Sequence, residues 1–156
     1  MKTVFFNLTF FTFLLHCTIV SSEQGINDVA ELTYYKNGKT YKVARNVGEI
    51  LTRMEWIFLN ADDSFLLAIN ENLLKNTKKE GAVEITYISP KLLKAGFIDK
   101  HLNISSLLIP LEGRFTDQHA TVFYADPGYR QFNVLVNKNG IPAINHIKEL
   151  LKDALI

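Results

Sequence analysis

Alternating apolar and polar residues predict a β-hairpin over Leu32–Ala44, the first regular pattern after the N-terminal segment. Two arms rich in Thr, Tyr and Val flank Asn37 and Gly38. Asn-Gly tolerates the positive φ values of a type I′ turn, which makes this dipeptide the strongest hairpin signal in the chain. The pattern therefore predicts two antiparallel strands joined by a two-residue turn.

The period changes to a helical one over Asn46–Asn60. Asn46 is expected to cap this helix, and Glu49, three residues later, to complete a capping box. Apolar residues at helical spacing form one face. They are Ile50, Leu51, Met54, Ile57 and Phe58.

The pattern over residues 56–70 is ambiguous. Turn-type residues interrupt the helix, and Phe65–Asn70 is a short, continuous apolar run. Such a run is compatible with a buried strand or with part of a helix, and periodicity does not separate the two. We favour a strand, followed by a polar helix over Glu71–Glu80 that ends at Gly81 as its C-terminal cap.

Strand patterns follow. Val83–Ile88 alternates, with its apolar side chains on one face, and Pro90 is expected to end it. Ile104–Phe115 is a long strand candidate that contains Pro110. Because proline donates no hydrogen bond to a ladder, Pro110 indicates a bulge or an edge position.

Two more strand candidates, Ala120–Ala125 and Arg130–Val136, flank an Asp-Pro-Gly turn at 126–128. The last segment returns to helical spacing, and Pro142 suits its first turn. Consecutive strands joined by short turns favour antiparallel pairing with helices packed on one face. The predicted fold class is α+β, with an antiparallel sheet and a C-terminal amphipathic helix.

Residues 1–22 differ from the rest of the chain. Lys2 is their only charge, and an apolar run leads to small residues. These are the parts of a secretory signal peptide, with Val20 and Ser22 placed for cleavage before Glu23. An uncleaved anchor is disfavoured because polar residues interrupt the run, which is shorter than the ~20 apolar residues of a spanning helix. We expect a secreted or periplasmic protein, a single domain over 23–156 and no stable membrane span after cleavage.

Charge and cysteine content narrow the function classes. The chain has 17 Lys+Arg and 16 Asp+Glu, so it is balanced once Lys2 is removed, which argues against nucleic acid as the main partner. The one cysteine, Cys17, lies in the predicted signal peptide, which leaves no disulfide or thiolate metal site. A small exported domain without disulfides is typical of the bacterial periplasm. A local basic cluster, interpreted as a solvated hairpin face, comprises Lys36, Lys39, Lys42 and Arg45.

Motifs for catalysis are scarce. No G-x-S-x-G, H-E-x-x-H or P-loop pattern is present, and the sequence predicts no metal and no cofactor. Asp117 and His119 lie two residues apart at a predicted turn, where a carboxylate can orient an imidazole for acid–base work. A solvated turn has the same composition and is the favoured interpretation.

The turn at 126–128 is the predicted binding surface. We expect Phe123 or Tyr124, with Tyr129 and Arg130 at the turn, to stay partly exposed and to contact a protein or a cell-envelope component. The alternative is that both strands are buried and Tyr129 packs over the turn.

The sequence favours an exported binding domain. It does not distinguish such a domain from an inhibitor or an immunity-type protein. The alternative is a small secreted hydrolase that uses Asp117 and His119.

Overall fold

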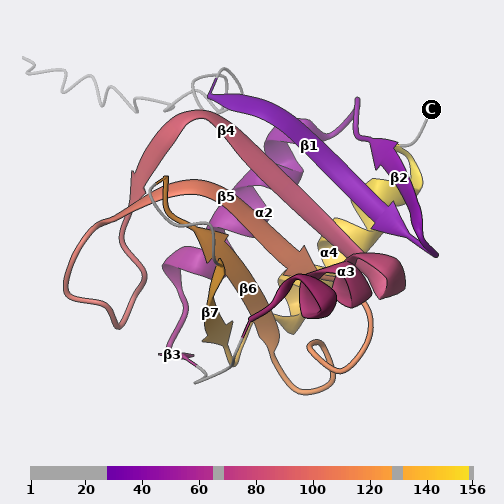
Figure 1. Ribbon diagram of the computed structural model, residues 1–156. Coiled ribbons are helices and arrows are strands. Elements are labelled where there is room, and N and C mark those ends of the chain that lie inside the picture. Colours follow the sequence, from indigo (N-terminus) through magenta and orange to yellow (C-terminus); the bar gives the residue numbers. More distant parts are fainter. Residues whose placement is uncertain (1–27, 65–68, 128–131, 155–156) are drawn as a thin grey trace, which may run out of the picture.

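The computed structural model describes residues 28–64, 69–127 and 132–154. These residues form a seven-stranded antiparallel sheet and three helices (Figure 1). The predicted α+β class is confirmed. In chain order the elements are β1 (Val29–Lys36), β2 (Lys39–Lys42), α2 (Val47–Leu59), β3 (Asp63–Ser64), α3 (Glu71–Glu80), β4 (Gly81–Leu93), β5 (Leu102–Pro110), β6 (Ala120–Ala125), β7 (Phe132–Asn137) and α4 (Ile141–Lys152). The strand order in the sheet is β2-β1-β4-β5-β6-β7-β3.

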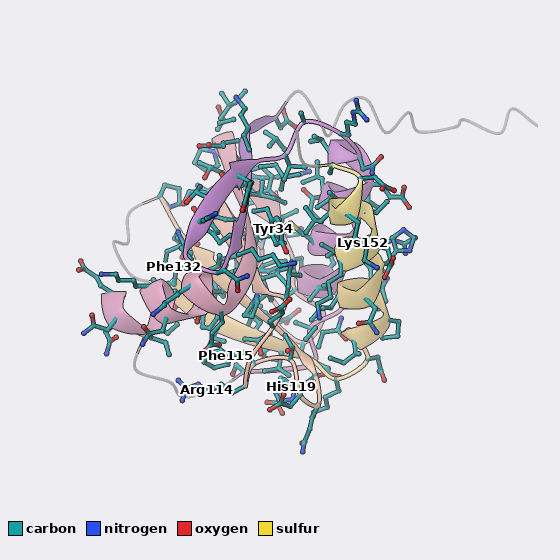
Figure 2. All side chains as sticks on the ribbon, turned by 90° about the vertical axis from the view of Figure 1, so that its right-hand side faces the viewer. Tyr34, Arg114, Phe115, His119, Phe132 and Lys152 are labelled. Atoms are coloured by element: carbon teal, nitrogen blue, oxygen red, sulfur yellow. The ribbon has the colours of Figure 1, made fainter. Side chains whose placement is uncertain are left out.

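Helices α2 and α4 pack side by side on one face of the sheet, as predicted (Figures 1 and 2). The prediction that the helices share one face is wrong for α3, which lies across part of the opposite face because Leu73 and Leu74 pack on the smaller cluster there. The larger hydrophobic core lies between the sheet and the α2–α4 pair, and it includes Ile57, Ile85 and Ile147. A smaller cluster, which includes Leu108 and Phe123, lies on the α3 side. Each face of the central strands is therefore buried, at least in part.

The β1–β2 hairpin is confirmed. Asn37 and Gly38 have φ values of 52° and 73°, the positive pair that a type I′ turn requires. Tyr35 pairs with Thr40 across the turn. This part of the chain follows its local sequence signal because the turn residues alone set the register.

The predicted capping box of α2 is wrong. Asn46 adopts a left-handed conformation and its side chain does not cap the helix. The side-chain amide of Asn46 instead donates a 3.1 Å hydrogen bond to the Leu150 carbonyl of α4. A carboxylate oxygen of Glu49 lies 2.7 Å from Nε2 of His146, which is also on α4. Both side chains join α2 to α4, a contact between segments about a hundred residues apart that local sequence does not reveal.

Pro90 does not end its strand, contrary to the prediction. β4 continues to Leu93, and its pairing with β5 shifts register between Thr86 and Lys91. Pro90 lies in that irregular segment, where no ladder hydrogen bond is required of its nitrogen.

Pro110 is the last residue of β5 and pairs with Ala82 of β4. The next amide, Leu111 N–H, donates to the Gly81 carbonyl on the β4 side. Backbone groups of successive strand residues point to opposite sides, so the Pro110 nitrogen points toward the β6 side. The pairing of β5 with β6 ends at Leu108, and no β6 residue is paired with Pro110. Proline thus occupies a local edge, as expected.

The ambiguous segment is partly described. α2 ends at Leu59, and Asp63–Ser64 pairs with β7 as the short edge strand β3. Most of the predicted strand over Phe65–Asn70 lies outside the described residues. The predicted polar helix is confirmed as α3, with Gly81 as its C-terminal cap.

The closing helix α4 is amphipathic, as predicted. Pro142 lies in its first turn, and its buried residues are Ala143, Ile144, Ile147 and Leu151. The predicted signal peptide, residues 1–22, lies outside the described residues. Within the residues that the structure describes, no helix has the length and apolar character needed to cross a membrane.

Candidate functional site

The two described rings of the predicted aromatic surface, Phe123 and Tyr124, are buried. Phe123 has no exposed area and packs edge-on against Phe115, with 5.3 Å between the ring centroids. Tyr124 is 8% exposed and packs edge-on against Phe58 of α2 at 5.5 Å. The expectation that one of these two rings stays exposed is wrong, because α2 covers one face of β6 and the segment after β5 covers the other. Tyr129 and Arg130 lie outside the described residues.

Asp117 and His119 lie in the segment between β5 and β6. Asp117 is exposed and His119 is half-buried. Figure 2 shows His119 at the same end of the molecule as Arg114 and Phe115. The segment is held by the Thr121 hydroxyl, which donates a 3.0 Å hydrogen bond to the Phe115 carbonyl.

A groove of about 650 Å³ lies between the β1–β2 hairpin and α3, and we refer to it as the basic groove. Its lining residues are Tyr35, Gly38, Lys39, Thr40, Asn72, Lys75, Asn76, Lys78 and Lys79. The two walls meet where the Gly38 amide donates a 3.2 Å hydrogen bond to the Lys79 carbonyl. The hairpin turn is thereby tied to the last turn of α3.

The sequence of α3 determines which of its side chains pack on the sheet and which are exposed. The helix starts where the Asn70 side chain accepts a 2.9 Å hydrogen bond from the Leu73 amide. Leu73 and Leu74 pack toward the smaller hydrophobic cluster. The exposed side then presents residues at helical spacing along one stripe. These are Asn72, Lys75, Asn76 and Lys79.

The inner end of the groove is formed by Tyr35 and Lys78, which both bind Glu84, a residue outside the groove lining. The Tyr35 hydroxyl and the Lys78 ammonium each donate a 2.7 Å hydrogen bond to the same carboxylate oxygen of Glu84. Lys78 also lies over the Tyr35 ring, 4.7 Å from its centroid. Burial, together with the Glu84 carboxylate, raises the pKa of Tyr35 well above its ordinary value of 10.0. Tyr35 therefore stays a neutral hydrogen-bond donor at any physiological pH.

The lining is charged with one sign. Among the residues that the structure describes, the lining contains four lysines and no carboxylate, although the whole chain has a net charge of only +1. Lys78 is neutralised by Glu84, which lies beneath it. In the part of the chain that the structure describes, Lys39, Lys75 and Lys79 form no ion pair. Three ammonium groups are therefore available to an anion.

Two further hollows adjoin the basic groove. Asn76 and Lys79 line one together with Asn37 and Glu80. Asn76 also lines another, which reaches Arg114 beyond the C-terminal half of α3. The hollows share side chains, so together they follow the surface of α3 rather than form separate sites.

Exposed large hydrophobic side chains lie outside the groove lining: Trp56, Leu59, Ile88, Leu92 and Phe97. Nothing in the described part of the chain indicates what would cover them, so the groove is the better candidate. Over residues 28–64, 69–127 and 132–154, no group of three or more His, Cys, Asp or Glu side chains is placed to hold a metal ion.

Sequence reasoning found one wall of this groove and missed the other. Lys39 belongs to the basic hairpin cluster that the sequence shows, which was interpreted as a solvated face. Lys75 and Lys79 lie more than thirty residues later, in a helix whose exposed stripe holds only Asn and Lys. That stripe was the signal, but only the fold shows that it faces the hairpin.

Comparison of the chain with known proteins yields no match, whether to a protein-family model, a curated protein or a solved structure.

Proposed function

We propose that this chain is a binding domain that holds an anionic partner, a protein or a cell-envelope component, in the basic groove. The observation that supports this proposal is that the described part of the lining has four lysines and no carboxylate, in a chain that is nearly neutral overall. Such local segregation of charge costs repulsion among the lysines, which an anionic ligand relieves.

Helix stability explains only part of this charge. Lys78 and Lys79 lie in the last turn of α3, where cations interact favourably with the helix dipole. Lys75 lies in the middle of the helix, and Lys39 lies on the hairpin, where no such effect operates. A ligand that bridges both walls accounts for all of them.

The groove is also preorganised. Without a ligand, the hydrogen bond from Gly38 to Lys79 joins its two walls, and the ion pair between Lys78 and Glu84 fixes α3 to β4. A binding surface that is already ordered loses less conformational entropy on association. This geometry suits a stable recognition surface. We further propose that the protein acts outside the cell, because the sequence predicts a signal peptide.

Binding to model polyanions tests the proposal. Fluorescent poly-L-glutamate and polygalacturonate are titrated with the purified protein and with Lys75→Gln/Lys79→Gln. The matched control is Lys148→Gln/Lys152→Gln, an equally spaced pair on α4 with the same change in net charge. We expect the groove variant to weaken binding about tenfold at low salt, because two charge-assisted contacts are lost, and the control to stay within about twofold.

An equal loss in both variants would show that only net charge matters. Failure of the wild-type protein to bind any polyanion would also overturn the proposal. Circular dichroism checks that each variant keeps its fold, which we expect because Lys75 and Lys79 are exposed and form no ion pair in the described part of the chain.

A further inference from the structure

We infer that the ligand of the basic groove is an acidic polysaccharide, a chain of sugars that bear carboxylate or sulfate groups. This inference rests on the proposed function and narrows it to one ligand class. It is supported by the composition of the stripe on α3, by the continuity of the hollows around it and by the kinds of side chain that the described lining does not offer.

The stripe alternates amides with ammonium groups. Asn72 and Asn76 are one helical turn apart, and Lys75 and Lys79 repeat the same spacing beside them. An amide both donates and accepts hydrogen bonds, as does a sugar hydroxyl, whereas an ammonium group only donates and favours an anion. A polymer of sugar acids presents hydroxyl groups and anionic groups at regular intervals. The stripe offers asparagine amides for the hydroxyls and lysine ammonium groups for the anions.

The hollows suit an elongated ligand. The basic groove, the hollow near Asn37 and the hollow near Arg114 all include Asn76 in their linings. A chain seated on the stripe can continue from Lys39 past Asn76 toward Arg114. The path carries cations at both ends and crosses Glu80 only in its later part.

Two other polyanions fit less well. Single-stranded nucleic acids are held by aromatic rings on which bases stack. Among the described residues, the only aromatic ring in the groove lining is that of Tyr35, which has Lys78 over its face and its hydroxyl bound to Glu84. Insertion into a lipid surface needs exposed apolar side chains beside the cations, and the large exposed hydrophobic residues of the described segments lie outside this lining.

The test separates the amides from the lysines. Affinities for polygalacturonate, poly-L-glutamate, inorganic polyphosphate and neutral dextran are measured by calorimetry for the purified protein and for Asn72→Ala/Asn76→Ala. Both asparagines are exposed, and alanine favours the helix, so we expect α3 to persist. The double variant should lose about tenfold in affinity for polygalacturonate and less than about twofold for polyphosphate.

Each outcome has a distinct meaning. If polygalacturonate, polyglutamate and polyphosphate bind equally and the asparagine variant changes none of them, the saccharide inference is wrong and the proposed anion binding stands. If dextran binds as tightly as polygalacturonate, charge plays no part and both proposals fail. Vesicles of anionic lipid are titrated in the same way, and if they bind more tightly than polygalacturonate, the ligand class is a membrane surface and the inference is overturned.

Discussion

The hydroxyl of Tyr35 donates a 2.7 Å hydrogen bond to the carboxylate of Glu84, joining β1 to β4 on the face that α3 covers. Lys78 of α3 donates to the same oxygen. One carboxylate thus links two strands and a helix. It also keeps Lys78 in place at the inner end of the basic groove.

Removal of the Tyr35 hydroxyl should cost stability. We expect Tyr35→Phe to lower the free energy of unfolding by about 1 kcal/mol, the net contribution of one such hydrogen bond. Tyr41→Phe is the matched control, because its hydroxyl forms no hydrogen bond within the described residues, and it should stay within about 0.5 kcal/mol. Denaturant titration followed by Trp56 fluorescence measures both. Equal effects would show that the bond to Glu84 contributes nothing.

A similar trio on the other face predicts how stability depends on alkaline pH. The Tyr87 hydroxyl and the Lys91 ammonium both donate to one oxygen of Glu55 on α2, at 2.8 and 2.7 Å. Burial, followed by the Glu55 carboxylate, raises the pKa of Tyr87 far above 10.0. The unfolded phenol ionises near pH 10 while the folded one stays protonated, so this contribution is complete below pH 10 and is lost above it.

Above pH 10, the free energy of unfolding of the wild-type protein should therefore fall by roughly 1.4 kcal/mol more per pH unit than that of Tyr87→Phe. At pH 7 the variant is expected to be less stable by about 1 kcal/mol, so the two stability curves converge as the pH rises. Denaturant titrations at pH 7, 9, 10.5 and 11 measure this. Parallel curves would contradict the assignment of a raised pKa to Tyr87.

Substitution of Phe123 should affect folding rather than binding. We expect Phe123→Ala to cost about 4 kcal/mol because it opens a cavity next to Phe115, and Phe123→Leu to cost less than about 1.5 kcal/mol. The folded Phe123→Leu protein should bind polygalacturonate within about twofold of wild type. If a Phe123 variant kept its stability but lost its affinity for polygalacturonate, the binding surface would instead lie on this hairpin.

The hydrolase alternative makes a separate prediction. If the protein is a binding domain, His119→Ala and Asp117→Asn leave polygalacturonate affinity within about twofold, because neither residue lines the groove. Incubation of the wild-type protein with the same polymers should release no shorter products, as judged by chromatography. Product release that His119→Ala abolishes, with the fold intact by circular dichroism, would instead support the hydrolase.

The location of the protein is tested by its N-terminus. Expression of the whole chain in a secreting bacterial host should yield an exported protein that begins at Glu23, as read by mass spectrometry. A Val20→Lys change disrupts the position three residues before the cleavage site and should leave the precursor unprocessed. A full-length wild-type protein retained in the cytoplasm would overturn the prediction of export.

The sequence by itself determined the local elements. Asn37 and Gly38 predicted the hairpin because their backbone preferences act within four residues. The apolar spacing of α2 and α4 predicted their buried faces for a similar reason, since side-chain periodicity follows from backbone geometry. These signals, with the short turns between later strands, were sufficient for the α+β class.

Only the tertiary structure decided the positions of the functional groups. Asn46 and Glu49 satisfy a capping pattern, yet they contact α4 because that helix packs alongside. Phe123 and Tyr124 are buried because both faces of β6 are covered, which alternation in one strand does not reveal. The basic groove arises because sheet pairing brings the β1–β2 hairpin next to α3. Contacts between distant segments depend on how the elements pack, and the pattern of any single segment carries no record of its neighbour.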